Sequence, residues 1–364
     1  MFSRFLMVVL VAVLPVTPVL AEDPVVNVYN WSDYIADEVL EEFQAQSGIK
    51  VVYDVYDSNE VLEAKLLAGR SGYDLVFPTA RPFAQRHITA GIYQPLDKSR
   101  LANLGNLDPV IMAQLAEIDA GNAHVVPYMW GTTSIGYNVS KVAERLGADA
   151  AVDTWSLIFD PENAKRLADC GISLLDDPTE VLSAALIYLG KNPNSTAKAD
   201  LDAALAMLQK IRPYVRYFHS SQYINDLANG DVCVTHGYSG DILQARDRAD
   251  EAKNGVEVAI TIPREGAILA IDVMAIPADA RHPQNAHAFI DYLLRPDVMA
   301  RITNYVAFAN PVPASLPLLD PEVRNDPGIF PPQEVLARLR SPEELSPADT
   351  RARTRAWTRL KAGR

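Results

Sequence analysis

Hydrophobic residues in the first part of the chain follow two spacings, one typical of strands and one typical of helices. Val25 to Tyr29 and Val51 to Val55 are short runs rich in β-branched residues, as in buried strands. Ser58 can cap a following helix that Gly69 ends, and Tyr73 to Phe77 predicts a third strand. Between the first two strands, apolar residues share one helical face: Ile35, Val39, Leu40 and Phe43. This β-α-β-α-β order favours an α/β lobe with a mostly parallel sheet.

The same alternation returns later in the chain. Strand-like segments are Gly171 to Leu175, Asp231 to Thr235, Val256 to Ile262 and Leu269 to Ile276. Helical segments are Val181 to Leu189, Asp200 to Ile211 and Asn285 to Leu294. We therefore expect a second α/β lobe, joined to the first by extended crossings at Val125 to Asn138 and around Asn254 to Ile262. Several short crossings between two lobes make a hinge.

The hydrophobic run at the N-terminus has a different meaning. Arg4 precedes the apolar residues Phe5 to Leu14, and small residues follow before position 21. This order is typical of a secretory signal peptide over residues 1–21. The alternative is a membrane anchor, but Pro15 and Pro18 interrupt the run, which is shorter than the roughly 20 residues that span a bilayer. We expect export with cleavage.

Composition and net charge indicate the class of protein and the kind of ligand or partner it can bind. The 364 residues are 49% hydrophobic and 22% charged, as in an ordinary globular protein, which excludes a disordered scaffold or a disulfide miniprotein. There are 46 acidic and 33 basic residues, a net charge of −13. Such a field repels nucleic acid and anionic membranes and attracts cations. It favours a cationic ligand and no nucleic-acid partner.

Patterns that would indicate catalysis or metal binding are missing. The six histidines show neither an HExxH arrangement nor a short spacing to cysteine. A nucleophile elbow at Gly237 to Gly240 would need glycine where Asp241 stands. Gly190 to Thr196 has the residues of a P-loop in the wrong order. We predict no enzyme activity, no cofactor and no metal site.

The two cysteines, Cys170 and Cys233, both follow the leader. In an oxidising compartment they can form a disulfide. The bond would close a loop of about 60 residues and, by the loss of chain entropy in the unfolded state, stabilise the fold by ~4 kcal/mol. The alternative is two separate buried thiols. We expect the disulfide.

Aromatic and acidic residues gather at the predicted carboxyl ends of strands, where ligands bind in open α/β sheets. Each alone has a structural explanation, as a helix cap, a turn or a core residue. Together they fit a cavity for a cation, because carboxylates neutralise ammonium groups and each aromatic face adds ~0.5 to 2 kcal/mol of cation–π attraction. They are Trp31 to Tyr34, Asp176, Asp177, Glu180, Tyr238, Asp241 and Asp272.

Six stretches carry a family pattern: Val28 to Ile35, Asp54 to Leu62, Pro127 to Trp130, Leu174 to Pro178, Arg216 to Asp231 and Arg353 to Thr358. In these stretches the sequence resembles the periplasmic putrescine/spermidine-binding proteins of polyamine ABC importers. The resemblance covers essentially the whole chain after the leader.

The resemblance implies a type II periplasmic-binding-protein fold, with two α/β lobes, a mixed sheet flanked by helices in each, and the ligand in the cleft between them. Residues 22–132 and about 256–310 would form the first lobe. Residues 133–255 and about 311–364 would form the second lobe with the C-terminal helices. The implied function is to capture a polyamine in the periplasm and deliver it, as a monomer, to an ABC permease without chemistry.

Carried over by position, the resemblance implies a ligand-binding set of Trp31, Ser32, Asp33, Tyr34, Thr79, Glu180, Tyr238, Asp241, Asp272 and Phe308. Asp241 and Asp272 would each neutralise a terminal amine, and Glu180 would hold an internal or second amine. Trp31, Tyr34 and Tyr238 would pack against the carbon chain.

Some positions depart from the family pattern. Tyr238 stands where relatives carry tryptophan, Phe308 where they often carry tyrosine, and Ala270 where they usually carry a large aromatic residue. The predicted aromatic box is therefore thinner and roomier. Arg81 either points to solvent or opposes a purely cationic ligand and pairs with a carboxylate on one that bears both charges. Spermidine, agmatine, cadaverine or an amino-acid-like amine, and a role as a periplasmic polyamine sensor, stay open.

Overall fold

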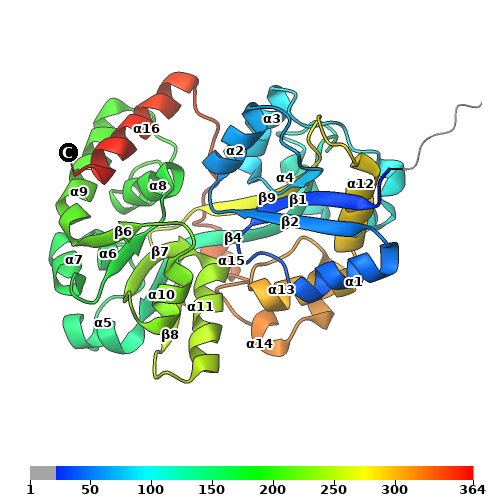
Figure 1. Ribbon diagram of the computed structural model, residues 1–364. Coiled ribbons are helices and arrows are strands. Elements are labelled where there is room, and N and C mark those ends of the chain that lie inside the picture. Colours follow the sequence, from blue (N-terminus) through cyan, green and yellow to red (C-terminus); the bar gives the residue numbers. More distant parts are fainter. Residues whose placement is uncertain (1–21, 364) are drawn as a thin grey trace, which may run out of the picture.

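The computed structural model describes residues 22–363, so the predicted signal peptide at 1–21 lies outside the described residues. Helices and strands alternate along the chain, which confirms the predicted α/β class (Figure 1). The strands are β1 (Val25–Trp31), β2 (Lys50–Tyr56), β3 (Leu75–Val76), β4 (Val125–Asn138), β5 (Ile172–Leu174), β6 (Val215–Phe218), β7 (Val234–Tyr238), β8 (Val258–Thr261) and β9 (Leu269–Ala275).

The helices surround these strands. The α-helices are α1 (Asp37–Ser47), α2 (Asn59–Leu67), α3 (Gln85–Thr89), α4 (Pro109–Leu115), α5 (Val139–Leu146), α6 (Ser156–Phe159), α7 (Pro161–Leu167), α8 (Pro178–Tyr188), α9 (Lys198–Ile211), α10 (Tyr223–Asn229), α11 (Ser239–Ala252), α12 (Pro283–Leu293), α13 (Pro296–Val306), α14 (Pro321–Arg324), α15 (Gln333–Leu336) and α16 (Pro347–Lys361). Shorter helical turns are η1 (Ala80–Ala84), η2 (Lys98–Arg100), η3 (Ala102–Asn106), η4 (Arg212–Tyr214) and η5 (Pro313–Leu318).

Strand β4 connects two groups of strands. The strand order is β2-β1-β3-β9-β4-β7-β5-β6, and β8 also pairs with β4. From Val125 to Thr132, β4 pairs antiparallel with β9, and from Thr133 onward it pairs antiparallel with β7. Parallel pairs flank this centre on both sides, β1 with β2 and β3, and β5 with β6 and β7. Each group is thus a mixed sheet.

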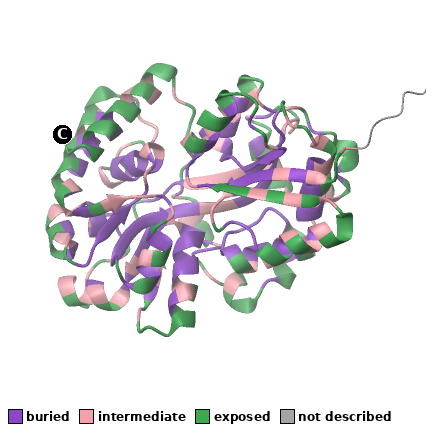
Figure 2. Cartoon of the chain, in the orientation of Figure 1, coloured by how far each residue is buried: buried purple, intermediate pink, exposed green. Residues whose placement is uncertain are grey.

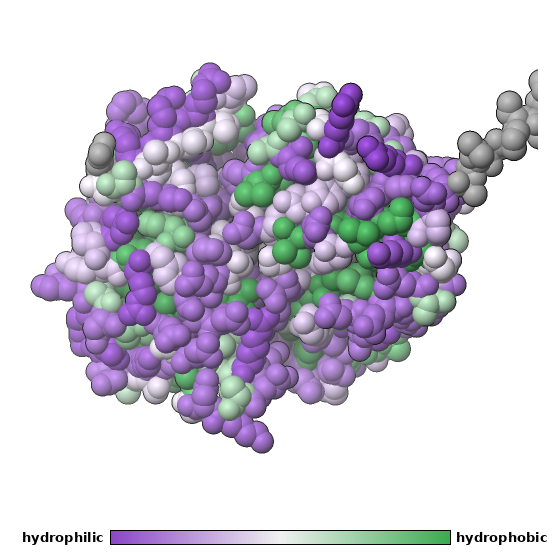
Figure 3. All heavy atoms as spheres, in the orientation of Figure 1, coloured by the Kyte–Doolittle hydropathy of each residue, from purple (hydrophilic) through white to green (hydrophobic). Residues whose placement is uncertain are grey.

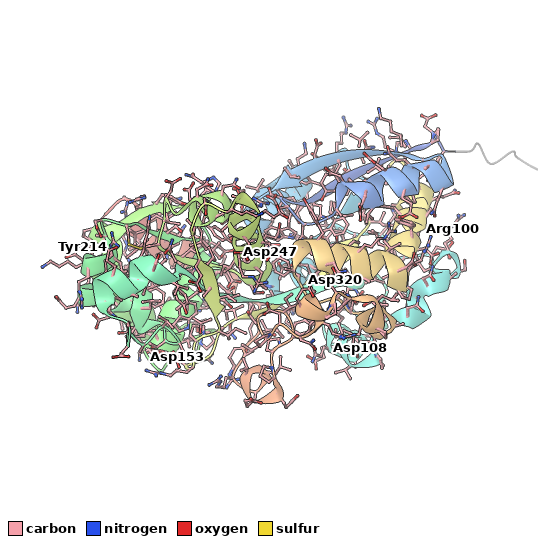
Figure 4. The ribbon with its side chains drawn as sticks, turned by 90° about the horizontal axis from the view of Figure 1, so that it is seen from below. Arg100, Asp108, Asp153, Tyr214, Asp247 and Asp320 are labelled. Atoms are coloured by element: carbon pink, nitrogen blue, oxygen red, sulfur yellow. A yellow bond between two sulfur atoms is a disulfide. The ribbon has the colours of Figure 1, made fainter. Side chains whose placement is uncertain are left out.

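The two groups of strands lie in two lobes, each with its own core (Figure 1). Phe77, Tyr128 and Phe289 are fully buried in the first lobe, and Trp155 and Phe159 in the second. The central strands are largely buried, whereas the edge strand β2 and the outer helix faces are largely exposed (Figure 2). Seen from below, the lobes lie side by side, with Arg100 on the first and Tyr214 on the second (Figure 4).

Hydrophilic residues cover most of the face seen in Figure 3. Within residues 22–363, no helix has the length and hydrophobicity that crossing a membrane requires.

Most predicted elements appear where the hydrophobic pattern places them. Ser58 caps α2 by accepting a hydrogen bond from the Val61 N–H, and Gly69 follows the helix with a φ of 69°. Strand β7 starts three residues later than predicted, because Asp231 and Val232 donate their N–H groups to the Asp226 carbonyl in the turn after α10.

The crossings differ in part from the prediction. Val125 to Asn138 is a crossing, as expected. The segment around Asn254 to Ile262 is not, because β8 pairs with Ile135 to Asn138, in the second lobe's half of β4. The chain instead returns to the first lobe in β9, which pairs with β3 and with the first half of β4.

Cys170 and Cys233 form a disulfide, as predicted, with Cα atoms 5.5 Å apart. The bond ties the segment after α7 to the residue before β7, inside the core of the second lobe.

Candidate ligand-binding site

A narrow cavity with a volume of about 60 Å³ lies where the two lobes meet. The first lobe contributes the segments after β1 and β2 together with β9. The second lobe contributes the first turns of α8 and α11. Nine of the ten predicted site residues line it: Trp31, Ser32, Tyr34, Thr79, Glu180, Tyr238, Asp241, Asp272 and Phe308.

Asp272, in the middle of β9, is held by two hydroxyl groups of its own lobe. Tyr34 Oη donates to Oδ2 and Thr79 Oγ1 donates to Oδ1, both over 2.7 Å. Asn59 fixes Thr79 in turn, donating to Oγ1 over 3.0 Å and accepting from its N–H over 3.1 Å. Burial raises the pKa of Asp272 to about 6, against the lowering effect of these hydrogen bonds.

Asp241 faces the cavity from the first turn of α11 in the second lobe. Tyr223 Oη donates to its Oδ2 over 2.6 Å and accepts from the Tyr238 N–H over 3.0 Å. One hydroxyl group therefore positions both the carboxylate and the backbone of the neighbouring aromatic residue. Burial raises the pKa of Asp241 to about 7.

Glu180 lies in the first turn of α8. Asp177 caps this helix, accepting from the N–H groups of Thr179 and Glu180 over 2.7 and 3.0 Å. Thr133 Oγ1 donates to Glu180 Oε2 over 2.5 Å. Burial, followed by the nearby charge of Asp177, raises the pKa of Glu180 to about 8. The sequence prediction treated Asp177 as a cap or a ligand contact, and the structure places it as the cap.

Aromatic rings form the walls. Trp31 donates from Nε1 to the Phe77 carbonyl over 2.8 Å and packs against Tyr56 at a centroid distance of 4.8 Å. Across the cleft its ring meets Tyr238 edge-on at 6.2 Å, which joins the two lobes in a closed arrangement. Phe308 lies edge-on to Tyr34 at 5.0 Å.

Glycine makes the position of Phe308 possible. A Cβ on Gly240 would lie 2.1 Å from the Phe308 ring, and one on Gly131 would lie 2.6 Å from it. Neither position could carry a larger residue without moving the ring. The two glycines thus let β4 and the start of α11 close on the aromatic wall.

Asp33 and Arg81 lie outside this cavity. Asp33 has a φ of 54° and directs its carboxylate to Arg248, at 2.7 Å. Arg81 turns instead to Glu117, with Nη2 and Oε2 2.8 Å apart.

Several lining residues were absent from the predicted set. Tyr56 ends β2 and Asp57 directly follows it. Other strand ends supplied predicted site residues, so the same signal could have found these two. No pattern marked the others, because sheet pairing and loop packing bring them to the cavity: Asn59, Gly131, Thr132, Thr133, Ser220 and Ser221.

The charged residues that line the cavity are all acidic. Asp57, Glu180, Asp241 and Asp272 line the cavity, and none of the lining residues in the described chain is Lys, Arg or His. Among residues 22–363, no three His, Cys, Asp or Glu side chains come together as a metal site. Carboxylates between aromatic walls suit an organic cation, whose ammonium groups they neutralise while the rings contact its methylenes.

The sequence matches the family model of bacterial extracellular solute-binding proteins over residues 38–331. It is 54% identical over 345 residues to the putrescine-binding periplasmic protein PotF of Escherichia coli, covering 94% of this chain and 93% of that protein. It is 54% identical over 344 residues to the putrescine-binding periplasmic protein SpuD of Pseudomonas aeruginosa, covering 94% of each. Among solved structures, the spermidine/putrescine ABC transporter substrate-binding protein PotD of Streptococcus pneumoniae superimposes with a TM-score of 0.74 at 26% identity, covering 93% of this chain and 99% of that one.

Fold and site together define a two-lobed binding protein that encloses a small ligand in its cleft, and the predicted type II periplasmic-binding-protein fold is confirmed. The chain belongs to the family of bacterial extracellular solute-binding proteins.

Proposed function

We propose that this protein captures a polyamine of the putrescine or spermidine type in the periplasm and delivers it to an ABC importer. The observation that carries the proposal is the cavity itself, where four carboxylates converge between aromatic walls with no basic residue among those that line it in the described chain. The names of the relatives, which bind putrescine and spermidine, support the same ligand class.

The proposed roles follow from where each carboxylate stands. Asp272 belongs to the first lobe and Asp241 to the second, so a diamine held between them would bridge the lobes and favour closure. Glu180 would take a second or internal amine. Trp31 and Tyr238, which meet across the cleft, would cover the carbon chain.

The closing motion is proposed to occur about β4. The change of its partner from β9 to β7 between Thr132 and Thr133 supports the proposed boundary between residues 132 and 133. Because β8 pairs with the second-lobe half of β4, we propose that the return to the first lobe begins at β9 rather than at about residue 256. We further propose that the leader at 1–21 directs export and that the protein acts as a monomer.

Isothermal titration calorimetry tests the function. The chain from Glu22 onward is unfolded and refolded with its disulfide intact, to remove any carried-over ligand, and is titrated with putrescine, cadaverine, spermidine, spermine, agmatine and 4-aminobutyrate. We expect one polyamine to bind 1:1 with a Kd of about 1 μM or tighter, about −8 kcal/mol.

Butane-1,4-diol, which has the length of putrescine without its charges, is the matched control and should give no heat of binding. Silence across all the polyamines, or equal binding of the diol, would overturn the proposal.

A further inference from the structure

Besides the cavity, the two lobes also meet along a groove of about 410 Å³, which we call the interlobe groove. The first lobe lines it with the start of α2 and with η1 and α3, and the second lobe with the start of α8 and with α16 (Figure 1). Asn59 of α2 and Glu180 of α8 line the cavity, whereas their neighbours Glu60 and Thr179 line the groove. The first turns of α2 and α8 therefore stand between the two spaces.

Glu60, the second residue of α2, has a buried carboxyl oxygen in this region. Its Oε2 is shielded from solvent and has no hydrogen-bond partner among the described residues. Asp177, which caps α8 and is 2% exposed, brings a second carboxylate close to it from the other lobe. Burial, followed by the charge of Asp177, raises the pKa of Glu60 well above its usual range. Two acidic groups of different lobes thus approach each other when the lobes are closed.

The basic side chains that line the groove already have partners. Arg86 of α3 donates from Nε and Nη2 to Glu63 Oε1, over 3.0 and 2.7 Å. The others are Lys361, which pairs with Asp176 at 2.5 Å, and Arg353, which donates to the carbonyls of Pro193 and Ser195. The remaining titratable groups around Glu60 are Glu63, Asp176, Glu343 and the Tyr238 hydroxyl. Within the described chain, no unpaired cation lines the groove to neutralise Glu60.

We propose that closure of the lobes binds a proton at Glu60, so that the grip on the ligand depends on a group outside the ligand cavity. This inference rests on the proposed function, because it concerns closure around the ligand. Separating the lobes would take Glu60 away from Asp177 and into solvent, where a glutamate is ionised at neutral pH. Closure would bury that charge beside a like charge, so the carboxyl group takes up a proton instead. The contribution of Glu60 to closure is therefore largest at low pH and is lost as the pH rises.

This proton moves in the opposite direction from those of the cavity. The carboxyl groups of Glu180, Asp241 and Asp272 line the cavity, and a bound ammonium group favours their ionised forms, so they release protons. Glu60 lines the groove and not the cavity, and it gains a proton when the lobes close. The net number of protons released on binding therefore separates the two kinds of group.

Glu60→Gln replaces the carboxyl group with a neutral group of the same shape. The refolded protein is titrated with putrescine and with spermidine at pH 7, in buffers of different ionisation enthalpy, and the calorimetric heats give the number of protons released. We expect Glu60→Gln to release between about half a proton and one proton more than the wild type, whereas Glu180→Gln should release fewer. The Kd of Glu60→Gln should be at least about threefold lower than that of the wild type at pH 8, with a smaller difference at pH 6.

Glu343→Gln is the matched control, because Glu343 lines the same groove but is exposed. It should change neither the number of protons nor the Kd. Weaker binding by Glu60→Gln would mean that Glu60 attracts the ligand as an ionised carboxylate, and it would overturn the inference, as would a proton number equal to that of the wild type. In those cases the proposed function stands, since a polyamine still binds. If neither polyamine binds the wild type, the proposed function fails and this inference fails with it.

Discussion

Arg248 of α11 donates from Nη2 to Asp33 Oδ1 over 2.7 Å, which joins the second lobe to the segment after β1 in the first. Arg248 also donates from Nη1 to Asn225 Oδ1, again over 2.7 Å. Gln244, one turn earlier in α11, donates to the Asp33 carbonyl over 3.3 Å. Because Asp33 belongs to the first lobe and Arg248 and Gln244 to the second, separating the lobes would break the two bonds to Asp33. We therefore predict that Asp33 acts on closure rather than on the ligand.

We expect Arg248→Gln to weaken ligand binding modestly. The ion pair has side chains 32% and 37% exposed, and such pairs contribute ~0.2 to 1 kcal/mol, which corresponds to a Kd raised up to about fivefold. The loss should shrink at high salt, since exposed charges are screened. Calorimetry at low and high ionic strength measures both effects.

Asp33→Asn is the partner variant. It should produce the same loss, and the double variant should lose no more than either single one. A loss larger than tenfold in Asp33→Asn alone would instead assign Asp33 a direct contact with the ligand.

Substituting either central carboxylate should weaken polyamine binding much more. Asp241→Ala and Asp272→Ala are each expected to lose more than ~1.5 kcal/mol, or over tenfold in Kd, because each removes a charge-assisted contact with an ammonium group. Tyr223→Phe keeps the Asp241 carboxylate but removes the hydroxyl that positions it, so its loss should be smaller. Wild-type affinity in both alanine variants would refute the roles proposed for them.

Ligand affinity should rise between pH 6 and pH 8. Burial raises the pKa of Asp272 to about 6, of Asp241 to about 7 and of Glu180 to about 8. A cation binds the ionised carboxylates, so binding near pH 7 should release protons. Calorimetry in buffers of different ionisation enthalpy measures the number released, and Glu180→Gln should lower it. An affinity that does not change over this pH range would show that these groups do not contact the ligand.

The same pKa shifts set the stability of the ligand-free protein. A carboxyl group with a raised pKa keeps its proton in the folded state at a pH where the unfolded chain, with a pKa of about 4, has lost it. The stabilisation from these three groups is therefore complete below about pH 4 and is lost as the pH rises through 6 to 8. Urea unfolding at several pH values measures the combined pH dependence, and comparison with Glu180→Gln isolates the contribution of Glu180.

The local sequence pattern predicted the positions of individual strands, helices and helix caps. The spacing of apolar residues located β1, α1 and β2, and Ser58 caps α2 as its sequence context suggested. Most of the candidate site could also be predicted from the sequence, because strand ends converge in an α/β sheet and the family resemblance supplied the remaining positions. The direction of a side chain at a strand end could not be predicted, since it depends on backbone angles and distant partners. Asp33 shows this, with its positive φ and its bond to Arg248, which is 215 residues away.

Contacts between segments far apart in the sequence also could not be predicted. The β-branched run at Val256 to Ile262 suits a strand in either lobe, and only its pairing with Ile135 to Asn138 places it in the second. The supporting hydroxyl of Tyr223 was missed for the same reason, because a tyrosine on an ordinary helix carries no signal of the aspartate it will contact.

Removing the disulfide should destabilise the protein without changing ligand affinity. The bond between Cys170 and Cys233 closes a 63-residue separation, and the loop-entropy description predicts a loss of about 4 kcal/mol in the free energy of unfolding. Neither cysteine lines the cavity, so Cys170→Ser/Cys233→Ser should bind polyamine within about twofold of wild type at a temperature where it is folded. Urea unfolding and calorimetry on the same preparation measure the two quantities. A loss below about 1 kcal/mol would mean that the unfolded chain already holds these segments close together, and a large loss of affinity in the folded variant would mean that the bond also shapes the second-lobe side of the site.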